Sequence, residues 1–312
     1  MQTITLVTGG AGFIGSHVVE RLLAEGHVVR ILNDFSTGDE DNLRDVSDKI
    51  QLIKGSILDK ELVRGAVAGC QTVIHLAALT SVPDSIKRPS DYMEVNVVGS
   101  SNVLAAAKDA GVRRVVMASS AAVYGNEVEP PVTENIVSAH RCSPYAVSKY
   151  AMEEIGREFS KRGLNCISLR LFNVFGPRQR GDSGYAAAIP AFMEACRMGK
   201  NPVIYGDGNQ TRDFTYVGNV AEAFVRAATL PGIGGVYNIG SGRTITINEL
   251  CAEIIKISGA DVKTAHEAER AGDLKNSSAD ISRAFKHLGL REGQPLSEGL
   301  KATWDWFSRK RN

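Results

Sequence analysis

Short apolar runs alternate with segments whose apolar residues recur every three to four positions through the first half of the chain. The runs predict β-strands, and the periodic segments predict amphipathic helices. The expected strands are residues 3–8, 28–32, 50–54, 72–76, 112–118 and 165–171, and the expected helices are residues 13–25, 60–68, 92–110 and 144–162. Because the strands are almost continuously apolar, both faces of the sheet must be covered. This pattern is typical of an α/β fold with a Rossmann-type doubly wound parallel sheet.

The alternation loosens after about residue 175, where Gly176-Pro177 and Gly206-Asp207-Gly208 interrupt the apolar pattern. Helical periodicity returns at residues 186–198, 219–229, 248–258 and 296–310. We therefore predict a first domain over residues 1–174 and a smaller C-terminal α/β lobe over residues 175–312. The chain is expected to return to the large sheet near residues 210–240.

The composition argues against several classes of function. The 312 residues are 43% hydrophobic and 23% charged, which is ordinary for a globular protein. A net charge of +1 gives no reason to expect nucleic acid or an anionic membrane as partner. No apolar run approaches the roughly 20 residues of a membrane span, and residues 1–8 predict a strand instead of a signal peptide, so we expect a cytoplasmic protein. The five cysteines and six histidines lack metal-ligand spacing, which predicts reduced thiols and no metal.

A glycine fingerprint follows the first strand and opens the first helix. Gly9 permits a tight turn, Gly12 lets the backbone approach a pyrophosphate, and Gly15 allows close packing of helix on sheet. The second strand ends in Asn33-Asp34, which can reach the adenosine ribose, and no arginine follows directly. NAD is therefore favoured over NADP as the cofactor of the first domain. His75, at the end of the fourth strand, is interpreted as a packed core residue.

Tyr145 and Lys149 are four residues apart in a predicted helix, downstream of Ser119-Ser120. Such residues lie on one helical face, with about 6 Å between their Cβ atoms. The lysine charge is expected to lower the pKa of the tyrosine from its reference of about 10 towards neutrality. Since a phenolate near neutral pH is a general base, the pattern predicts an enzyme in which Tyr145 handles a proton while a nicotinamide carries hydride.

Taken together, these motifs resemble the extended short-chain dehydrogenase/reductase family, and within it the nucleotide-sugar 4-epimerases. The resemblance covers nearly the whole chain and is carried by residues 9–15, 75–78, 96–99, 119–125, 145–149, 169–177, 206–213, 237–240 and 270–273. The segments in or beside the second lobe are more specific to these epimerases than the glycine turn is.

The resemblance implies that Ser120 binds the sugar 4-hydroxyl, that Tyr145 takes its proton, and that Lys149 binds the nicotinamide ribose. The implied NAD contacts also include Gly9, Gly12, Phe13, Ile14, Gly15, Asn33, Asp34, Ser56, Ile57, Leu76, Ala77, Ala78, Asn96, Ser119 and Phe172. The implied contacts to a UDP-sugar substrate are Thr80, Ser120, Ala121, Asn173, Arg180, Tyr205, Arg212, Arg270, Asp273 and Ser277. A homodimer through helices 92–110 and 144–162 is implied by the same resemblance.

The residues after Ser120 favour one reaction of this family. Ala121 and Ala122 stand where related dehydratases carry an Asp-Glu pair and uronate decarboxylases carry a glutamate. Neither alanine can protonate a leaving group, so the resemblance favours C4 epimerisation of UDP-glucose and UDP-galactose through a 4-keto intermediate. Ser277 stands where a bulky tyrosine restricts some epimerases to plain hexoses, which predicts that UDP-GlcNAc and UDP-GalNAc are accepted as well.

The sequence leaves other functions open. Arg180 resembles an arginine that meets the C6 carboxylate in uronate 4-epimerases. A nucleotide-sugar dehydratase or reductase, and a non-catalytic NAD-sensing module, are further alternatives that product analysis would separate. Asn33 and Ser56 each replace an aspartate that is usual in the epimerases, so the affinity for the cofactor is open too.

Overall fold

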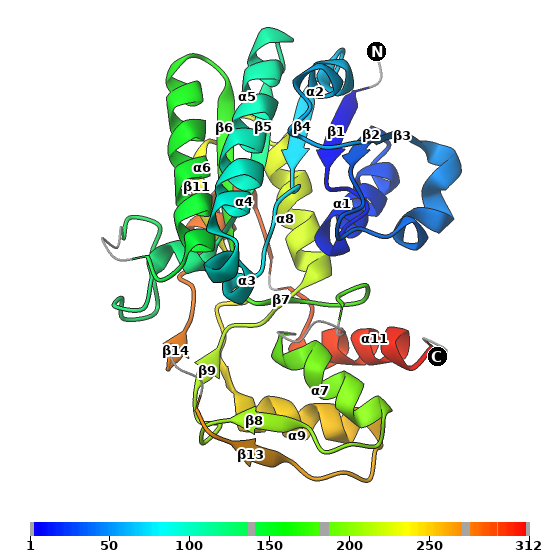
Figure 1. Cartoon of the computed structure of the whole chain (residues 1–312), viewed down its shortest axis with the longest axis vertical. Coiled ribbons are helices and arrows are strands. Elements are labelled where there is room, and N and C mark those ends of the chain that lie inside the picture. Colours follow the sequence, from blue (N-terminus) through cyan, green and yellow to red (C-terminus); the bar gives the residue numbers. More distant parts are fainter. Residues whose placement is uncertain (1–2, 137–140, 181–186, 270–274, 292, 310–312) are drawn as a thin grey trace.

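A seven-stranded sheet forms the centre of the larger part of the molecule (Figure 1). The computed structural model describes residues 3–136, 141–180, 187–269, 275–291 and 293–309. In spatial order the strands are β11 (Gly235–Ile239), β6 (Asn165–Leu171), β5 (Arg114–Ser120), β4 (Thr72–His75), β1 (Ile4–Thr8), β2 (Val28–Asn33) and β3 (Ile50–Lys54). All neighbouring strands are parallel, which confirms the predicted Rossmann-type doubly wound sheet.

The strand order reverses at β1, which pairs with β2 on one side and with β4 on the other. Thr8 is in register with both Leu32 and His75, so the three strands end within one residue of the same level. In doubly wound sheets a ligand crevice forms outside the carboxyl ends of the strands at such a switch point. The sheet therefore fixes the position of a site before any functional side chain is considered.

Alternate strand residues supply two separate cores, one on each face of the sheet. Val7 and Ile74 point to one face, while their neighbours Leu6 and Val73 point to the other, as a period of two requires. The first face is covered by α1 (Phe13–Ala24), α8 (Val217–Thr229) and α10 (Ser282–Leu288). The second is covered by α2 (Lys60–Val67), α5 (Ser100–Asp109) and α6 (Pro144–Lys161). Removal of this apolar surface from water stabilises the layered arrangement.

A smaller lobe lies beyond the carboxyl ends of the strands, in the lower part of Figure 1. Its core is formed by apolar residues of α7 (Ala188–Arg197), α9 (Ile247–Ser258) and α11 (Leu296–Arg309). Short strands complete it: β8 (Val203–Tyr205) with β13 (Ala265–Glu267), and β12 (Ile245–Thr246), β9 (Thr211–Arg212) and β14 (Asn276–Ser277) in a second group. At the junction, β7 (Val174–Phe175) pairs with β10 (Thr215–Tyr216).

The chain leaves the larger layer and returns to it. α8 packs beside α1, and β11 is the edge strand of the seven-stranded sheet, although both follow α7 in sequence. α10 packs on β11 and α8. We propose that residues 1–174 together with α8, β11 and α10 act as the cofactor domain, and that the rest of residues 175–312 acts as the substrate lobe.

Several elements differ from the sequence prediction. The predicted helix 92–110 consists of α4 (Pro89–Tyr92), a π-helical segment η2 (Met93–Gly99) and α5. The strand predicted over residues 112–118 lies two residues later, so Ser119 and Ser120 belong to β5 itself. The short helices η1 (Glu40–Lys49), α3 (Val82–Lys87) and η3 (Ala121–Tyr124) were missed because they are too short or too polar for an apolar period to appear.

Candidate active site

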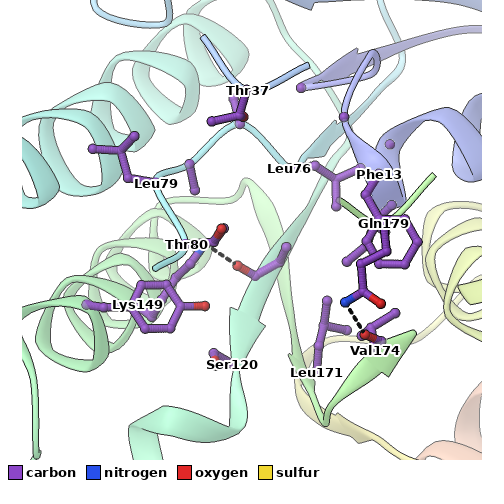
Figure 2. Close-up of a pocket in the computed structure, with 18 of the residues that line it drawn as sticks. Phe13, Thr37, Leu76, Leu79, Thr80, Ser120, Lys149, Leu171, Val174 and Gln179 are labelled. Carbon is purple, nitrogen blue, oxygen red and sulfur yellow. Dashed lines mark hydrogen bonds between the residues drawn. The ribbon is translucent and has the colours of Figure 1, made fainter. Parts of the chain in front are cut away.

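A cleft of about 1590 Å³ opens at the carboxyl ends of the central strands and continues to the smaller lobe. Figure 2 shows Ser120, Lys149 and Thr80 on one side of it and Phe13 and Gln179 on the other. Most of the site residues predicted from the sequence line this cleft: Gly9, Gly12, Phe13, Ile14, Gly15, Asn33, Asp34, Ile57, Leu76, Ala77, Ala78, Thr80, Ser119, Ser120, Ala121, Tyr145, Lys149, Phe172, Asn173, Arg180, Arg212 and Ser277.

The glycine turn has the shape that a dinucleotide requires. Gly9 has φ +71°, and a Cβ atom there would lie 2.8 Å from the backbone nitrogen of Ala77. A Cβ atom on Gly15 would lie 2.1 Å from the carbonyl oxygen of Gly9, so both positions exclude a side chain. Among the described residues, no side chain caps the N-terminus of α1, which follows an extended Gly12. The free N–H groups of such an end bind phosphate, so the turn fits a pyrophosphate.

The predicted ribose-binding residues at the end of β2 are held by local hydrogen bonds. Asn33 is buried, and its Oδ1 accepts from the backbone N–H of Ala11 at 3.3 Å. Asp34 accepts from the backbone N–H of Ser36 at 3.0 Å and from the Ser36 hydroxyl at 2.8 Å. Asn33 thus fastens the glycine turn to β2 while it lines the cleft. This second role was not predicted.

Tyr145, Ser120 and Lys149 come together at the opposite end of the cofactor part of the cleft. The Ser143 hydroxyl caps α6 by accepting from the N–H of Ala146 at 3.2 Å, and Pro144 follows at the first helical position. Tyr145 and Lys149 therefore lie in the first turns of α6. Their side chains face the end of β5, where Lys149 Nζ donates to the carbonyl oxygen of Ala118 at 2.8 Å.

Burial dominates the electrostatics of this cluster. It raises the pKa of the Tyr145 phenol, and a hydrogen bond with Ser120 opposes that rise. Burial also lowers the pKa of Lys149 to about 8, while the charge of Glu153 opposes the fall. The expected lowering of the tyrosine pKa by Lys149 is thus not realised in the protein chain, where desolvation raises that pKa and disfavours the phenolate.

His75 is a buried structural residue, as expected. Its Nδ1 lies 2.7 Å from the Thr8 hydroxyl, and its Nε2 lies 2.8 Å from the Ser100 hydroxyl. Ser100 donates to the carbonyl oxygen of Asn96 at 2.5 Å, so it accepts from the histidine, which assigns the proton to Nε2. Burial and the charge of Lys149 lower the pKa of His75 to about 3, so the ring is neutral.

Two predicted cofactor residues do not line the cleft. Asn96 is buried; its side chain binds the backbone N–H and carbonyl of Leu79 at 2.8 and 3.0 Å and donates to the Ser148 hydroxyl at 2.9 Å. It therefore holds the loop after β4 against α6. Ser56 accepts from the N–H of Leu58 at 3.2 Å and shapes the turn after β3. Both residues therefore form hydrogen bonds to the backbone of the site.

The substrate end of the cleft is formed by side chains from separate strands. Ser277 of β14 is in register with Arg212 of β9, and both line the cleft. Asn173, between β6 and β7, has φ +23° and donates to the carbonyl oxygen of Asp213 at 2.9 Å, which ties the sheet to the smaller lobe. Tyr205 lines a neighbouring cavity of about 320 Å³ that also borders Arg212. The predicted Arg270 and Asp273 lie outside the described residues.

Sequence reasoning missed some of the residues around the cleft. Gln179 lines it and donates to the carbonyl oxygen of Val174 at 3.0 Å, as Figure 2 shows. The signal was its place directly after Gly-Pro-Arg in a motif that was already recognised. Trp306 of α11 also lines the cleft, and no local pattern pointed to it. Behind the cleft, Arg170 of β6 forms a buried ion pair with Glu153, and the signal for it was a charged residue inside an apolar strand.

Other expectations concern metals, thiols and membranes. The five cysteines are free; Cys142 is exposed and the others are buried. Within the described ranges, no group of His, Cys, Asp and Glu has the arrangement of a metal site. Nor does any helix in the described part of the chain have the length and apolar character to cross a bilayer.

The fold and the site together define an NAD-dependent enzyme of the short-chain dehydrogenase/reductase type. Comparison with known proteins agrees: residues 5–240 match the model of the NAD dependent epimerase/dehydratase family. The chain belongs to this family. The resemblance to its nucleotide-sugar 4-epimerases is confirmed, as is NAD as the cofactor.

Relatives match over nearly their whole length. A UDP-glucose 4-epimerase of Mycolicibacterium smegmatis is 39% identical, covering 98% of this chain and 99% of its own. A UDP-N-acetyl-alpha-D-glucosaminuronate decarboxylase of Bacillus cytotoxicus is 33% identical, covering 100% of both. The solved structure of a UDP-N-acetylglucosamine 4-epimerase of Methanobrevibacter ruminantium, in complex with UDP-N-acetylmuramic acid, has a TM-score of 0.94 at 37% identity, covering 98% of this chain and 99% of its own.

Proposed function

We propose that this enzyme is an isomerase that interconverts UDP-hexoses that differ at C4, through a 4-keto intermediate. The observation that carries the proposal is the meeting of Tyr145, Ser120 and Lys149 in one cleft with the glycine turn, at the end of its cofactor part that lies away from that turn. A proton-transfer group and a cofactor site thus share one cavity, which an oxidation at a sugar carbon needs. The UDP-glucose 4-epimerase and UDP-N-acetylglucosamine 4-epimerase relatives support the same reaction.

The roles of the chain's own groups follow from their positions. Ser120 binds the sugar 4-hydroxyl, and Tyr145 takes the proton from that hydroxyl and later returns one. Lys149, fixed to the carbonyl of Ala118, stabilises the phenolate by its charge. NAD, when bound, supplies a hydride acceptor and, in its oxidised form, a positive charge. Because burial raises the pKa of Tyr145, this charge is what we expect to make ionisation favourable near neutral pH.

The two residues after Ser120 distinguish epimerisation from elimination. Ala121 and Ala122 line the cleft beside Ser120, and their methyl groups have no proton to donate. Water elimination and decarboxylation would both need a further acid or base at this point. The decarboxylase relative is therefore a weaker guide to the reaction than the epimerase relatives. Oxidation followed by reduction of the opposite face needs only the groups that are present.

A small side chain at the sugar end favours acetylated substrates. Ser277 lines the cleft in register with Arg212, and a serine leaves room that a tyrosine would fill. We propose that UDP-GlcNAc and UDP-GalNAc are substrates together with UDP-glucose and UDP-galactose. Ser277→Tyr should abolish turnover of the acetylated pair and spare the plain hexoses. Equal losses on both pairs, or no parental turnover of the acetylated pair, would refute this proposal.

Arg180 favours a second candidate, a UDP-uronate 4-epimerase. It lines the cleft, and a guanidinium there can pair bidentately with a C6 carboxylate. Incubation of the purified enzyme with UDP-galactose and with UDP-galacturonate, followed by separation of the products, decides between the two. Conversion of UDP-galactose to UDP-glucose supports the first proposal. Conversion of only the uronate supports the second, and a 4-keto-6-deoxy product would exclude both.

We also propose a homodimer through the face formed by α3, η2 and α6. Ile86 of α3, Val98 of η2 and Val147 of α6 are 65%, 49% and 43% exposed, which is unusual for large aliphatic residues. Within this group, α6 contacts both α3 and η2. Val98→Arg with Val147→Arg should yield a monomer in sedimentation velocity. A parent protein that sediments as a monomer would refute the proposal.

A further inference from the structure

A buried ion pair lies directly behind the catalytic cluster. The Glu153 side chain is 0% exposed and that of Arg170 is 2% exposed. Arg170 Nε and Nη2 donate to the two carboxylate oxygens of Glu153 at 2.9 and 2.7 Å. Such a bidentate pair needs good geometry and further hydrogen bonds to balance the cost of removing both charges from water. The Rossmann sheet itself does not require charges at these positions.

The pair is attached to both elements that carry the catalytic residues. Glu153 lies on α6, one helical turn after Lys149, so the two side chains share a face of the helix. On the β5 side, the Ser119 hydroxyl donates to Glu153, and Ser119 directly precedes Ser120. Arg170 comes from β6, the strand next to β5. One carboxylate therefore connects α6, β5 and β6 at the catalytic end of the cleft.

Glu153 is the negatively charged group that acts on Lys149, while the other titratable groups nearby are neutral or positive. Tyr145 on α6 is neutral in the protein chain because burial raises its pKa, and His75 on β4 is neutral because its pKa is about 3. Arg170 on β6 is positive, and its charge is paired with Glu153. Burial lowers the pKa of Lys149 to about 8, and Glu153 acts against that fall. The ammonium thus depends on this carboxylate as its stabilising charge.

We propose that Glu153 is a positioning residue of the reaction, whose buried carboxylate keeps Lys149 charged and holds the Ser119-Ser120 end of β5 against α6. The proposal rests on the roles proposed above for Tyr145 and Lys149. Arg170 in turn holds the carboxylate in place through two hydrogen bonds. A residue in contact with neither substrate nor cofactor thereby sets the pH range over which the catalytic tyrosine has a charged partner.

The test is the pH profile of kcat/KM for UDP-galactose in Glu153→Gln, which keeps the shape of the side chain and removes its charge. Without the carboxylate, Lys149 loses its proton at lower pH. The alkaline limb of the profile should therefore move down by about one pH unit or more, so that activity at pH 8 relative to pH 6 falls about fivefold or more. Glu158→Gln is the matched control, because it is the same change at an exposed position of the same helix. It should leave the profile unchanged.

A second variant keeps the test decisive if Glu153→Gln fails to fold because Arg170 is left unpaired. Glu153→Gln combined with Arg170→Met removes both charges, and its alkaline limb should move in the same direction by a smaller amount. A folded variant with reduced rates but the parental profile would overturn the proposal and leave the pair a structural role. Tyr145→Phe and Lys149→Met test the proposed function separately. If they are inactive while the Glu153 profile is parental, only the present inference fails.

Discussion

The two ends of the cleft are made in different ways. At the cofactor end, backbone at the switch point of the sheet forms the cradle, and Gly9 and Gly15 leave no room for a side chain. At the substrate end, single side chains such as Arg212 and Ser277 project from two-residue strands of the smaller lobe. A backbone cradle depends on the fold as a whole, whereas a side-chain site can be altered one residue at a time. Cofactor use should therefore resist change more strongly than substrate choice.

Tyr145 lies between the two ends and serves the reaction itself, so its loss should have the largest effect. Tyr145→Phe removes the general base while the ring and its edge-to-face contact with Tyr92 are kept. The rate of UDP-galactose conversion should fall by about 10²- to 10⁴-fold. Steady-state kinetics measures this, with NAD content as the control for an intact cofactor site. Turnover within a factor of a few of the parent would mean that another group handles the proton.

The cofactor end is best challenged at Gly15. Gly15→Ala places a Cβ atom 2.1 Å from the Gly9 carbonyl oxygen, so the turn must shift. Overpacking of this kind costs about 1–3 kcal/mol, which corresponds to about 5- to 150-fold weaker NAD binding. NAD titration monitored by calorimetry measures it. Gly65→Ala is the control, since its Cβ meets nothing within 4 Å in α2 and it should stabilise the fold by about 0.5–1 kcal/mol. Undiminished binding by the Gly15 variant would refute the rigid cradle.

The substrate end is best challenged at Arg212. Arg212→Met keeps the length of the side chain and removes a charge-assisted hydrogen bond, worth about 1.5–3 kcal/mol. The KM for UDP-galactose should rise about 10- to 100-fold while NAD binding stays parental. Arg309→Met, at an exposed position of the same lobe, should change neither value. Equal losses of cofactor and substrate binding would contradict the independence of the two ends.

A smaller effect concerns stability below neutral pH. His75 has a folded-state pKa of about 3, so between about pH 6.5 and pH 3 the unfolded chain binds a proton that the folded chain does not. This contribution to stability is complete above pH 6.5 and is lost as the pH falls towards 3. Between pH 7.5 and pH 4.5, the free energy of unfolding should therefore fall by about 2–3 kcal/mol less in His75→Gln than in the parent. Urea unfolding at the two pH values measures this difference. The control is His266→Gln, at an exposed position, whose free energy of unfolding should depend on pH as in the parent. The same pH dependence in His75→Gln would refute the assignment of His75 as a buried neutral residue.

The difference between the two ends also decided what the sequence could predict. The strands of the large sheet and the glycine turn follow from local apolar runs and from glycine spacing, and both were predicted. Tyr145 and Lys149 share one helix, so their proximity follows from a spacing of four. The approach of Ser120 to that pair depends on the pairing of β5 and β6 and on the packing of α6, to which only the resemblance pointed.

Long-range and backbone-mediated contacts were the parts that the sequence did not reveal. Asn96 was expected beside the cofactor, yet it binds the backbone of Leu79, because a buried amide takes the partners that the fold brings to it. The Glu153–Arg170 pair joins a helix and a strand through geometry that no spacing encodes. Trp306 reaches the cleft from the far end of the chain.

One isotope experiment tests the central claim most directly. UDP-galactose carrying deuterium at C4 is incubated with the purified enzyme, and the UDP-glucose formed is analysed for its label. If Tyr145 handles only the hydroxyl proton while the C4 hydrogen travels as hydride within a closed site, the deuterium should be retained at C4 of the product. Loss of the label to water, or incorporation of solvent deuterium at C4 in the reverse design, would contradict the account.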